Sequence, residues 1–210
     1  MEIDCIIQAR MSSSRLPGKV LYELGGQPLL KYLINRLENA ESINRIIVAT
    51  STDDSDDLLC DFCADNNIEY FRGSLDDVLS RYYETAKLYE SKNILRITAD
   101  CPLIDYRLID FASKNFIKES FDLYGLGGEF PDGLDFTFFT FESLERAHLN
   151  ANLPSEREHI CLYMEKNETH IGAFRPFCGM EWMRLTVDEP DDLSLLEELF
   201  SLNRELFKLS

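Results

Sequence analysis

Residues 5–19 read CIIQARMSSSRLPGK, an apolar run followed at once by a polar loop. The loop carries three cations, three consecutive serines and a Pro-Gly turn. Arginine offers a planar fork of donors, lysine offers a compact charge, and small residues let backbone N–H groups approach a ligand closely. This composition directly after a strand is typical of a polyphosphate-binding loop, and a solvated surface loop is the alternative.

The loop matches neither of the two common glycine-rich phosphate motifs. It lacks Gly-x-x-x-x-Gly-Lys-Ser/Thr, and it lacks Gly-x-Gly-x-x-Gly. Ligands of open α/β sheets bind beyond the carboxyl ends of the strands. We therefore expect a different phosphate-binding solution at the end of the first strand.

Short β-branched runs alternate with longer amphipathic stretches in the first half of the chain. The pattern predicts strands at 5–7, 45–50, 69–71 and 93–98, and helices with apolar periodicity around 29–37, 58–62 and 75–86. Repeated strand–helix alternation predicts a three-layer α/β fold, with a mostly parallel twisted sheet covered on both faces.

Capping residues mark several predicted helix starts. The acidic segment 53–54 is typical of a cap and first helical turn, with metal binding by 54–56 as the alternative. Segments 74–77 and 155–158 each have the Ser-x-x-acid spacing of a capping box.

The pattern changes after about residue 122, although we expect residues 1–210 to form a single domain. In order, we expect a partly alternating strand at 134–139 with one exposed face, helices at 141–150 and 155–166, an apolar patch at 174–183, a return to the sheet at 184–187 and a terminal helix after 190. The region 125–183 is expected to form a dimer contact or to bind an acceptor, unless its apolar patch closes the core of the monomer.

The composition limits the classes of partner. The 210 residues carry a formal net charge of −17, which argues against nucleic acid or an anionic membrane surface. No run approaches the roughly 20 apolar residues of a membrane span, and the acidic start is unlike a signal peptide. We expect a cytoplasmic protein with reduced thiols, in which Cys60 and Cys63 pack in a helix rather than form a redox or zinc pair.

Two aspartates share one sequence setting. Asp100 and Asp188 each follow a β-type run, and a proline stands two residues after each. Carboxylates at strand ends would face the same crevice as the basic loop, and together they could hold Mg²⁺, which prefers oxygen ligands and keeps phosphate oxygens in its shell. An Asx-turn or a helix cap is the alternative for either one.

On these residues the chain resembles the cytidylyltransferase family that includes the spore-coat polysaccharide protein F group, relatives of the enzymes that make CMP-activated Kdo, sialic acid and pseudaminic acid. The resemblance runs almost end to end, through 7–11, 15–19, 49–51, 71–73, 96–103, 131–135, 155–159 and 185–190. It implies a nucleotide-diphospho-sugar transferase fold of Rossmann-like type with a dimerisation excursion, a homodimer, and a role in surface polysaccharide biosynthesis.

The resemblance also implies which residues bind the nucleotide. Arg10, Arg15 and Lys19 would hold the triphosphate of CTP, and Asp100 and Asp188 would hold Mg²⁺. The other nucleotide contacts that it implies are Gln8, Ala9, Ser12, Ser13, Ser14, Arg72 and Thr98. The chain departs from the common family pattern at Ser12 and Ala99, where glycine is frequent, and in the loop 125–129, which would alter the sugar pocket.

The implied reaction is attack of a sugar hydroxyl on the α-phosphorus of CTP with departure of pyrophosphate, for which Arg10, Lys19, Asp100 and Asp188 form the catalytic set. The acceptors of the related enzymes are acidic sugars. Arg157 and His159 are therefore candidates for binding the acceptor carboxylate, and Asp135 for binding its hydroxyls. The alternatives are an exposed helix face for the first two and an outward-facing strand position for Asp135. His148 and His170 are expected at the surface.

Two other functions stay open from the sequence. A metal-dependent glycosyltransferase of similar architecture usually carries Asp-x-Asp at the strand end, where this chain has Thr98-Ala99-Asp100. A non-catalytic nucleotide-binding or scaffold protein would be expected to lack Lys19 or a metal carboxylate, and both are present.

Overall fold

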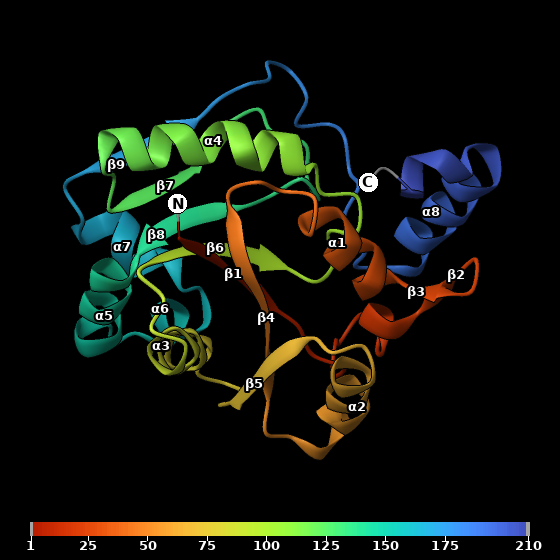
Figure 1. Cartoon of the computed structure of the whole chain (residues 1–210), viewed down its shortest axis with the longest axis horizontal. Helices are drawn as coiled ribbons and strands as arrows, with labels where there is room; N and C mark the ends of the chain where they lie inside the picture. Colours follow the sequence, from red (N-terminus) through yellow and green to blue (C-terminus); the bar gives the residue numbers. More distant parts are fainter. Residues whose placement is uncertain (1, 209–210) are drawn as a thin grey trace.

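A seven-stranded sheet forms the centre of the computed structural model, which describes residues 2–208 (Figure 1). The strand order is β5-β4-β1-β6-β8-β7-β9. The strands are β1 Ile3–Gln8, β4 Ile43–Ser51, β5 Glu69–Gly73, β6 Asn93–Thr98, β7 Leu123–Leu126, β8 Thr137–Thr140 and β9 Ile171–Phe174. The pairs are parallel except at β8, which runs antiparallel to both β6 and β7.

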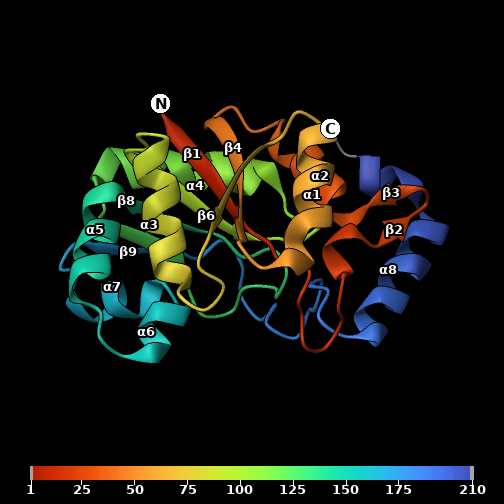
Figure 2. The ribbon, with the colours of Figure 1, turned by 90° about the horizontal axis from the view of Figure 1, so that it is seen from below.

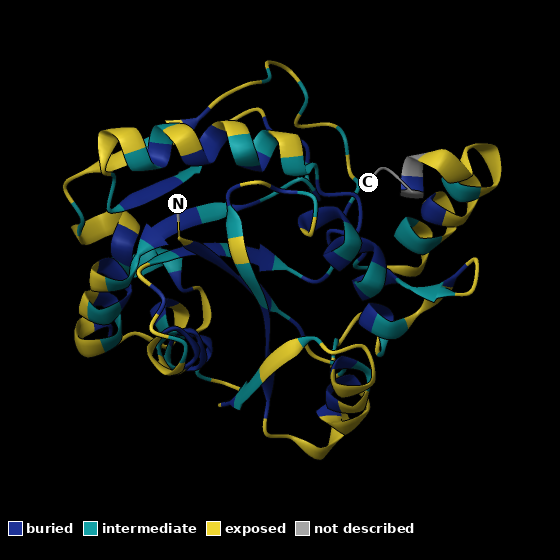
Figure 3. Ribbon diagram, in the orientation of Figure 1, coloured by how far each residue is buried: buried dark blue, intermediate teal, exposed yellow. Residues whose placement is uncertain are grey.

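Helices cover both faces of the sheet because its strands alternate apolar residues to either side. In β1, Cys5 and Ile7 pack in the core with α1 Leu29–Leu37, α2 Asp57–Asp65 and α4 Tyr106–Glu119. Ile6 packs in the opposite core, with α3 Val78–Leu88, α5 Phe141–Asn150 and α7 Cys161–Asn167. Figure 2 shows the second group and α6 Pro154–Glu158 on one side of the molecule, and the inner helix faces are buried in Figure 3. The predicted three-layer, mostly parallel α/β fold is confirmed.

A third, smaller core packs the C-terminal elements against α1 and the hairpin that precedes it. The helix α8 Pro190–Leu202 and the 3-10 helix η3 Arg204–Lys208 pack on α1 beside the short hairpin of β2 Glu23–Leu24 and β3 Gln27–Pro28. The 3-10 helices η1 Lys19–Leu21 and η2 Asp54–Asp56 complete the elements. No helix within residues 2–208 is long and apolar enough to cross a membrane.

Both predicted capping boxes are wrong. The cap of α3 is Asp77 itself, whose carboxylate accepts from the Ser80 N–H at 2.9 Å, while Ser74 forms the turn before it. Ser155 lies inside α6, which starts at Pro154. The single helix predicted for 155–166 is in fact two helices, α6 and α7.

The predicted strand at 134–139 is shorter and more buried than expected. It is β8, which begins at Thr137, and both Phe138 and Phe139 are completely buried. No face is exposed because β8 lies between β6 and β7, with Phe138 in one core and Phe139 in the other. Asp135 therefore precedes the strand.

Residues 184–187 do not return to the sheet as a strand. They run beside 131–135, joined by the isolated bridge between Asp132 and Arg184, and the Val187 N–H donates to the Asp100 carbonyl at 2.9 Å. Gly133 permits this approach, since its φ is +96° and a Cβ there would lie 2.2 Å from the Thr186 nitrogen. The crossing carries Asp188 to the end of β6.

The apolar patch predicted at 174–183 divides between the interior and the surface. Phe174 is buried and Phe177 packs against the same core, whereas Trp182 is 76% exposed. Part of the patch thus closes the core of the monomer. The dimer contact of 125–183 stays a prediction. Cys60 and Cys63 are buried in α2, so their predicted role in core packing is confirmed.

Candidate functional site

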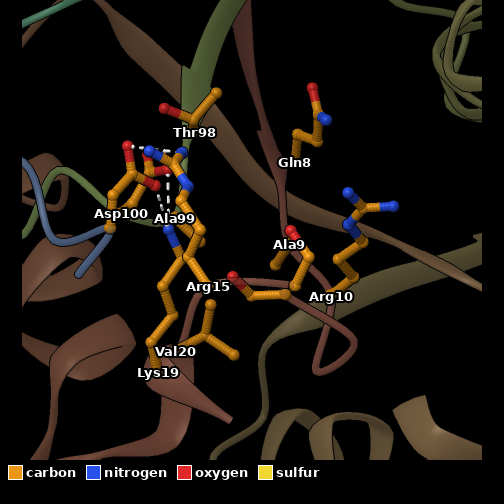
Figure 4. Close-up of a pocket in the computed structure, with 12 residues that line it drawn as sticks. Gln8, Ala9, Arg10, Arg15, Lys19, Val20, Thr98, Ala99 and Asp100 are labelled. Atoms are coloured by element: carbon orange, nitrogen blue, oxygen red, sulfur yellow. Dashed lines mark hydrogen bonds and ion pairs between the residues drawn. The ribbon is translucent and has the colours of Figure 1, made fainter. Parts of the chain in front are cut away.

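A cavity of about 190 Å³ opens where β1 and β6 end (Figure 4). It brings together the loop after β1, the segment after β6 and Asp188, which lies two residues before α8. Its lining residues are Gln8, Ala9, Arg10, Ser13, Ser14, Arg15, Lys19, Val20, Thr98, Ala99, Asp100 and Asp188. We call this the central cavity, and most of the nucleotide contacts predicted from the sequence lie in it.

The Lys19 ammonium stands between the two predicted metal carboxylates. Its Nζ lies 3.0 Å from Asp100 Oδ2 and 2.8 Å from Asp188 Oδ1, and it donates to the Val187 carbonyl at 2.7 Å. Three acceptors satisfy its three N–H donors, although the residue is only 8% exposed. One cation therefore holds together two carboxylates that would otherwise repel each other.

Asp188 is kept ionised by its neighbours. Burial on its own raises the pKa of the Asp188 carboxyl, but the hydrogen bond and charge of Lys19, with Arg15 and Arg184, lower that pKa below its ordinary value. Arg15 contributes an ion pair of 2.9 Å from its half-exposed side chain. An ionised carboxylate suits cation binding, and its lowered pKa makes it a weaker general base.

Asp192 fixes the backbone that carries Asp188. Its carboxylate accepts from the Asp188 N–H at 2.8 Å and from the Glu189 N–H at 2.9 Å. Arg184 donates to the same carboxylate at 2.7 Å and lowers the pKa of Asp192 to about 2. We had not identified this residue from the sequence, although the acid–Pro–x–acid spacing of 189–192 is a capping signal.

Asp56 anchors the polar loop and was also missed. Its fully buried carboxylate accepts from the Met11 N–H at 2.6 Å, from the Thr50 hydroxyl at 2.9 Å and from both the N–H and the hydroxyl of Ser51. The end of β4 is thereby tied to the start of the loop. Asp53 caps η2 as predicted, and with Asp56 engaged by four donors the geometry gives no support to a metal site at 54–56.

Two polar groups in the central cavity have no hydrogen-bond or ion-pair partner among residues 2–208. Gln8 Oε1 is buried without a hydrogen bond, and the exposed Arg10 guanidinium makes no ion pair or hydrogen bond with any described residue. Both residues also line a second cavity of about 440 Å³, formed with residues 75–78, 154 and 157–158. In Figure 4 they lie on the side of the central cavity away from Lys19 and Asp100. Both groups could therefore contact a ligand that extends from one cavity into the other.

Two predicted nucleotide residues lie outside the central cavity. Ser12 is exposed and does not line it. The Arg72 guanidinium donates to the Ser51 carbonyl, the Asp53 carbonyl and the Asp57 carboxylate at 2.7–2.9 Å. It orders the turn between β4 and α2, and nucleotide contact by either residue stays a prediction.

The three predicted acceptor residues are dispersed. Arg157 is already paired with Asp77 through contacts at 2.9 and 3.1 Å, and it lines the second cavity. His159 is exposed at the end of α6. Asp135 lines a third cavity, described below, and burial raises the pKa of its carboxyl. His148, expected at the surface, instead stacks half-buried on Tyr83 with the ring centres 4.1 Å apart.

The donor set for a metal consists of two carboxylates. Within the described residues no group of three or more His, Cys, Asp or Glu could hold a metal ion. Asp100 and Asp188 both reach one cation, Lys19, so they converge closely enough to share a ligand. Two carboxylates completed by phosphate oxygens and water fit Mg²⁺, which rarely uses an all-protein cage.

The lowered pKa of Asp192 predicts that the free energy of unfolding decreases as the pH falls from about 4 to about 2. A carboxylate whose folded-state pKa is about 2 stabilises the fold fully above its unfolded pKa of about 4, and this contribution is lost as the pH falls towards 2. Urea unfolding between pH 2 and 7 should show that Asp192→Asn weakens this dependence. Asp191→Asn, on the exposed side of the same turn, should behave like the wild type. Equal pH profiles for the two variants would contradict the assigned role.

Replacement of the Asp56 anchor should destabilise the fold. In Asp56→Asn, the new side-chain NH2 group would face N–H and O–H groups that donate to the carboxylate in the wild type. At least one of these donors would then lack an acceptor, which costs about 2 kcal/mol in the free energy of unfolding. Urea denaturation measures the loss. Asp54→Asn, at an exposed neighbouring position, is the control and should change stability little. If the two variants prove equally stable, Asp56 does not anchor the loop.

Comparisons with known proteins identify the family of the chain. The sequence profile of the cytidylyltransferase family matches residues 5–208. An uncharacterised protein of Methanocaldococcus jannaschii is 37% identical over 95% of this chain and 83% of its own length. The spore coat polysaccharide biosynthesis protein SpsF of Bacillus subtilis is 30% identical, over 93% of this chain and 85% of its own. A 3-deoxy-manno-octulosonate cytidylyltransferase of Haemophilus influenzae is 27% identical over 63% of this chain and 52% of its own.

Solved structures support the same relationship. A cytidylyltransferase from Leptospira borgpetersenii superposes with a TM-score of 0.92 at 30% identity, over 100% of this chain and 93% of its own. A CMP:2-keto-3-deoxy-manno-octonic acid synthetase complexed with CTP gives a TM-score of 0.72 at 16% identity, over 96% of this chain and 99% of its own, which shows a shared fold. Because the profile spans nearly the whole chain and the SpsF relative reaches 30% identity, the chain belongs to the cytidylyltransferase family.

Proposed function

We propose that this nucleotidyltransferase transfers CMP from CTP to a hydroxyl of an acidic sugar of the ulosonic or nonulosonic acid type and releases pyrophosphate. The observation that carries the proposal is the Lys19–Asp100–Asp188 cluster, which opens onto a cavity lined by two further cations. Family membership supports the reaction type, and the Haemophilus relative, by its name, acts on a sugar of this class.

The cations of the polar loop would bind the phosphates. Nucleotidyl transfer requires mainly that the reactants be positioned and that charge growing on the departing pyrophosphate be neutralised. Arg10 has no other partner among the described residues, and Arg15 is half exposed, so both can turn towards a ligand. Lys19 is buried at the base of the cavity and supplies a fixed positive charge there.

Asp100 and Asp188 would hold Mg²⁺ together with the phosphates. When bound, the ion neutralises phosphate charge and polarises oxygen. Asp188 suits this role because its carboxylate is ionised at neutral pH and shares the Lys19 ammonium with Asp100. Two contacts hold Asp188 in place. Its N–H donates to the Asp192 carboxylate, and the preceding residues pack closely against Gly133.

The nucleoside would extend from the central cavity into the second cavity. Gln8 Oε1 lies between the two as a buried acceptor without a donor, which a hydrogen-bond donor of the nucleoside would satisfy. Selection of cytosine follows from family membership rather than from this contact.

The biological setting is proposed by analogy. The name of the SpsF relative supports a role in surface polysaccharide biosynthesis. We also infer a cytoplasmic homodimer with contacts in 125–183, as the sequence resemblance implies.

Removal of the Lys19 charge should abolish most turnover while the fold is retained. Loss of one preorganised donor of this kind typically lowers the rate roughly 100- to 1000-fold. The assay is pyrophosphate release with each nucleoside triphosphate and a panel of ulosonic and nonulosonic acids, comparing Lys19→Ala with Lys114→Ala, an exposed position on α4. A fully active, folded Lys19→Ala variant would rule out the proposed role of Lys19.

Metal dependence is tested separately. Chelation with EDTA should stop pyrophosphate release, and added Mg²⁺ should restore it. Asp100→Asn should raise the Mg²⁺ concentration needed, because one of two charged oxygen donors is lost. Asp65→Asn, exposed at the end of α2, is the control. Undiminished turnover in EDTA would exclude the metal.

A further inference from the structure

A third cavity of about 510 Å³ adjoins the central one, and Thr98 lines both. Its floor is the sheet itself, with residues of β6, β8, β7 and β9, and α7 contributes Glu165 to the wall. The second and third cavities therefore meet the central cavity through different residues, the former through Gln8 and Arg10 and the latter through Thr98.

The third cavity contains an arginine, Arg96, for which residues 2–208 provide no hydrogen bond or ion pair. Arg96 lies on β6 opposite Thr137 of β8. Its Nε is buried without a hydrogen bond, and its guanidinium forms no hydrogen bond or ion pair with any residue that the structure describes. The nearby carboxylates are engaged elsewhere, since Asp100 pairs with Lys19 and Asp135 accepts from the Gly133 N–H at 2.8 Å.

The orphaned Nε is unfavourable for the free protein, because a buried donor without an acceptor has lost its hydrogen bond to water. Arg96 as a whole is partly exposed, and nearby groups, Asp100 among them, favour its charged form. Arginine is also the side chain whose planar fork best matches a carboxylate. The arrangement is explained if the counter-ion arrives with a ligand.

We propose that the third cavity binds the acceptor sugar and that Arg96 pairs with its carboxylate. This inference rests on the proposed function and specifies its acceptor as an anionic polyhydroxy compound. The remaining polar lining suits hydroxyl groups, since Thr98, Thr137, Asp135 and Glu165 offer hydroxyl and carboxylate oxygens. The shared residue Thr98 places the acceptor next to the phosphates.

The candidates first drawn from the sequence fit this role less well. The charge of Arg157 is already compensated by Asp77, and its cavity meets the central one on the side of Gln8 and Arg10. His159 is exposed and lines none of the three cavities. Asp135, by contrast, belongs to the same cavity as Arg96.

The test compares charged and neutral acceptors in variants of Arg96. The probes are 3-deoxy-manno-octulosonate, N-acetylneuraminate and their C1 carboxamides, with pyrophosphate release as the assay. The wild type should prefer the acids. Arg96→Gln should raise KM for the acid that the wild type uses by roughly 10- to 100-fold and remove the preference over its amide, with CTP affinity unchanged, and Arg96→Lys should restore part of the preference.

Urea unfolding of the variants distinguishes a role of Arg96 in ligand binding from a role in stabilising the fold. Because Arg96 forms no hydrogen bond or ion pair with a described residue, Arg96→Gln should unfold at about the same urea concentration as the wild type. Arg107→Gln, which removes an exposed arginine at the start of α4, is the matched charge control.

A second variant fills the cavity without touching Arg96. Gly125 of β7 lines this cavity, and a Cβ added there would meet nothing within 4 Å. The side chain of Gly125→Leu would therefore occupy part of the cavity. It should raise the acceptor KM at least tenfold while CTP binding, measured by calorimetry, stays unchanged.

The outcomes distinguish the two proposals. If Arg96→Gln keeps the wild-type preference for the acid, or if Arg157→Gln loses it instead, the assignment of Arg96 is wrong and the cytidylyltransferase proposal stands. Equal turnover of neutral and acidic sugars by the wild type would also overturn the assignment of Arg96. Failure of the wild type to release pyrophosphate from CTP with any probe would contradict the proposed function itself.

Discussion

The site depends on one ammonium group that sits between two carboxylates from distant parts of the chain. Lys19 comes from the first loop, Asp100 from the end of β6 and Asp188 from the approach to α8. Without a shared cation, two acids this close would repel each other in a partly buried setting. The lysine therefore organises the carboxylate pair and also supplies charge to the cavity.

Each of the three segments is held by contacts behind the site. Asp56 ties the first loop to β4 through its bond to the Met11 N–H. Gly133 allows residues 185–187 to cross closely, and the Val187 N–H reaches the end of β6. Asp192 then fixes the Asp188 backbone. Such support would matter for the proposed reaction, because groups fixed in position before the ligand arrives stabilise developing charge without reorganisation.

Sequence reasoning succeeded where a signal was local and failed where a partner was remote. Alternating strands and helices predict the sheet, and strand ends predict the place of Asp100, because both follow from neighbouring residues. The position of Asp188 beside the basic loop was predicted correctly although residues 184–187 form no strand, because the proline after it marks a turn in either case. The partners of Arg72 and Arg157 could not be foreseen, because Asp57 and Asp77 meet them only through tertiary packing. Arg96 could not be singled out from the sequence, because the missing acceptor for its Nε among the described residues is a property of the folded chain.

The protein has a net charge of −17, so binding of a nucleoside triphosphate requires local positive charge. The charge balance of the central cavity is therefore informative. Lys19 and Arg15 are paired with Asp100 and Asp188, so these four groups together are close to neutral. Only Arg10, among the cations of this cavity, has no partner in the described residues. A divalent cation delivered with the nucleotide would satisfy both carboxylates and leave Lys19 and Arg15 to the phosphates. In the proposed function, the affinity of this cluster for a triphosphate would therefore depend on that ion.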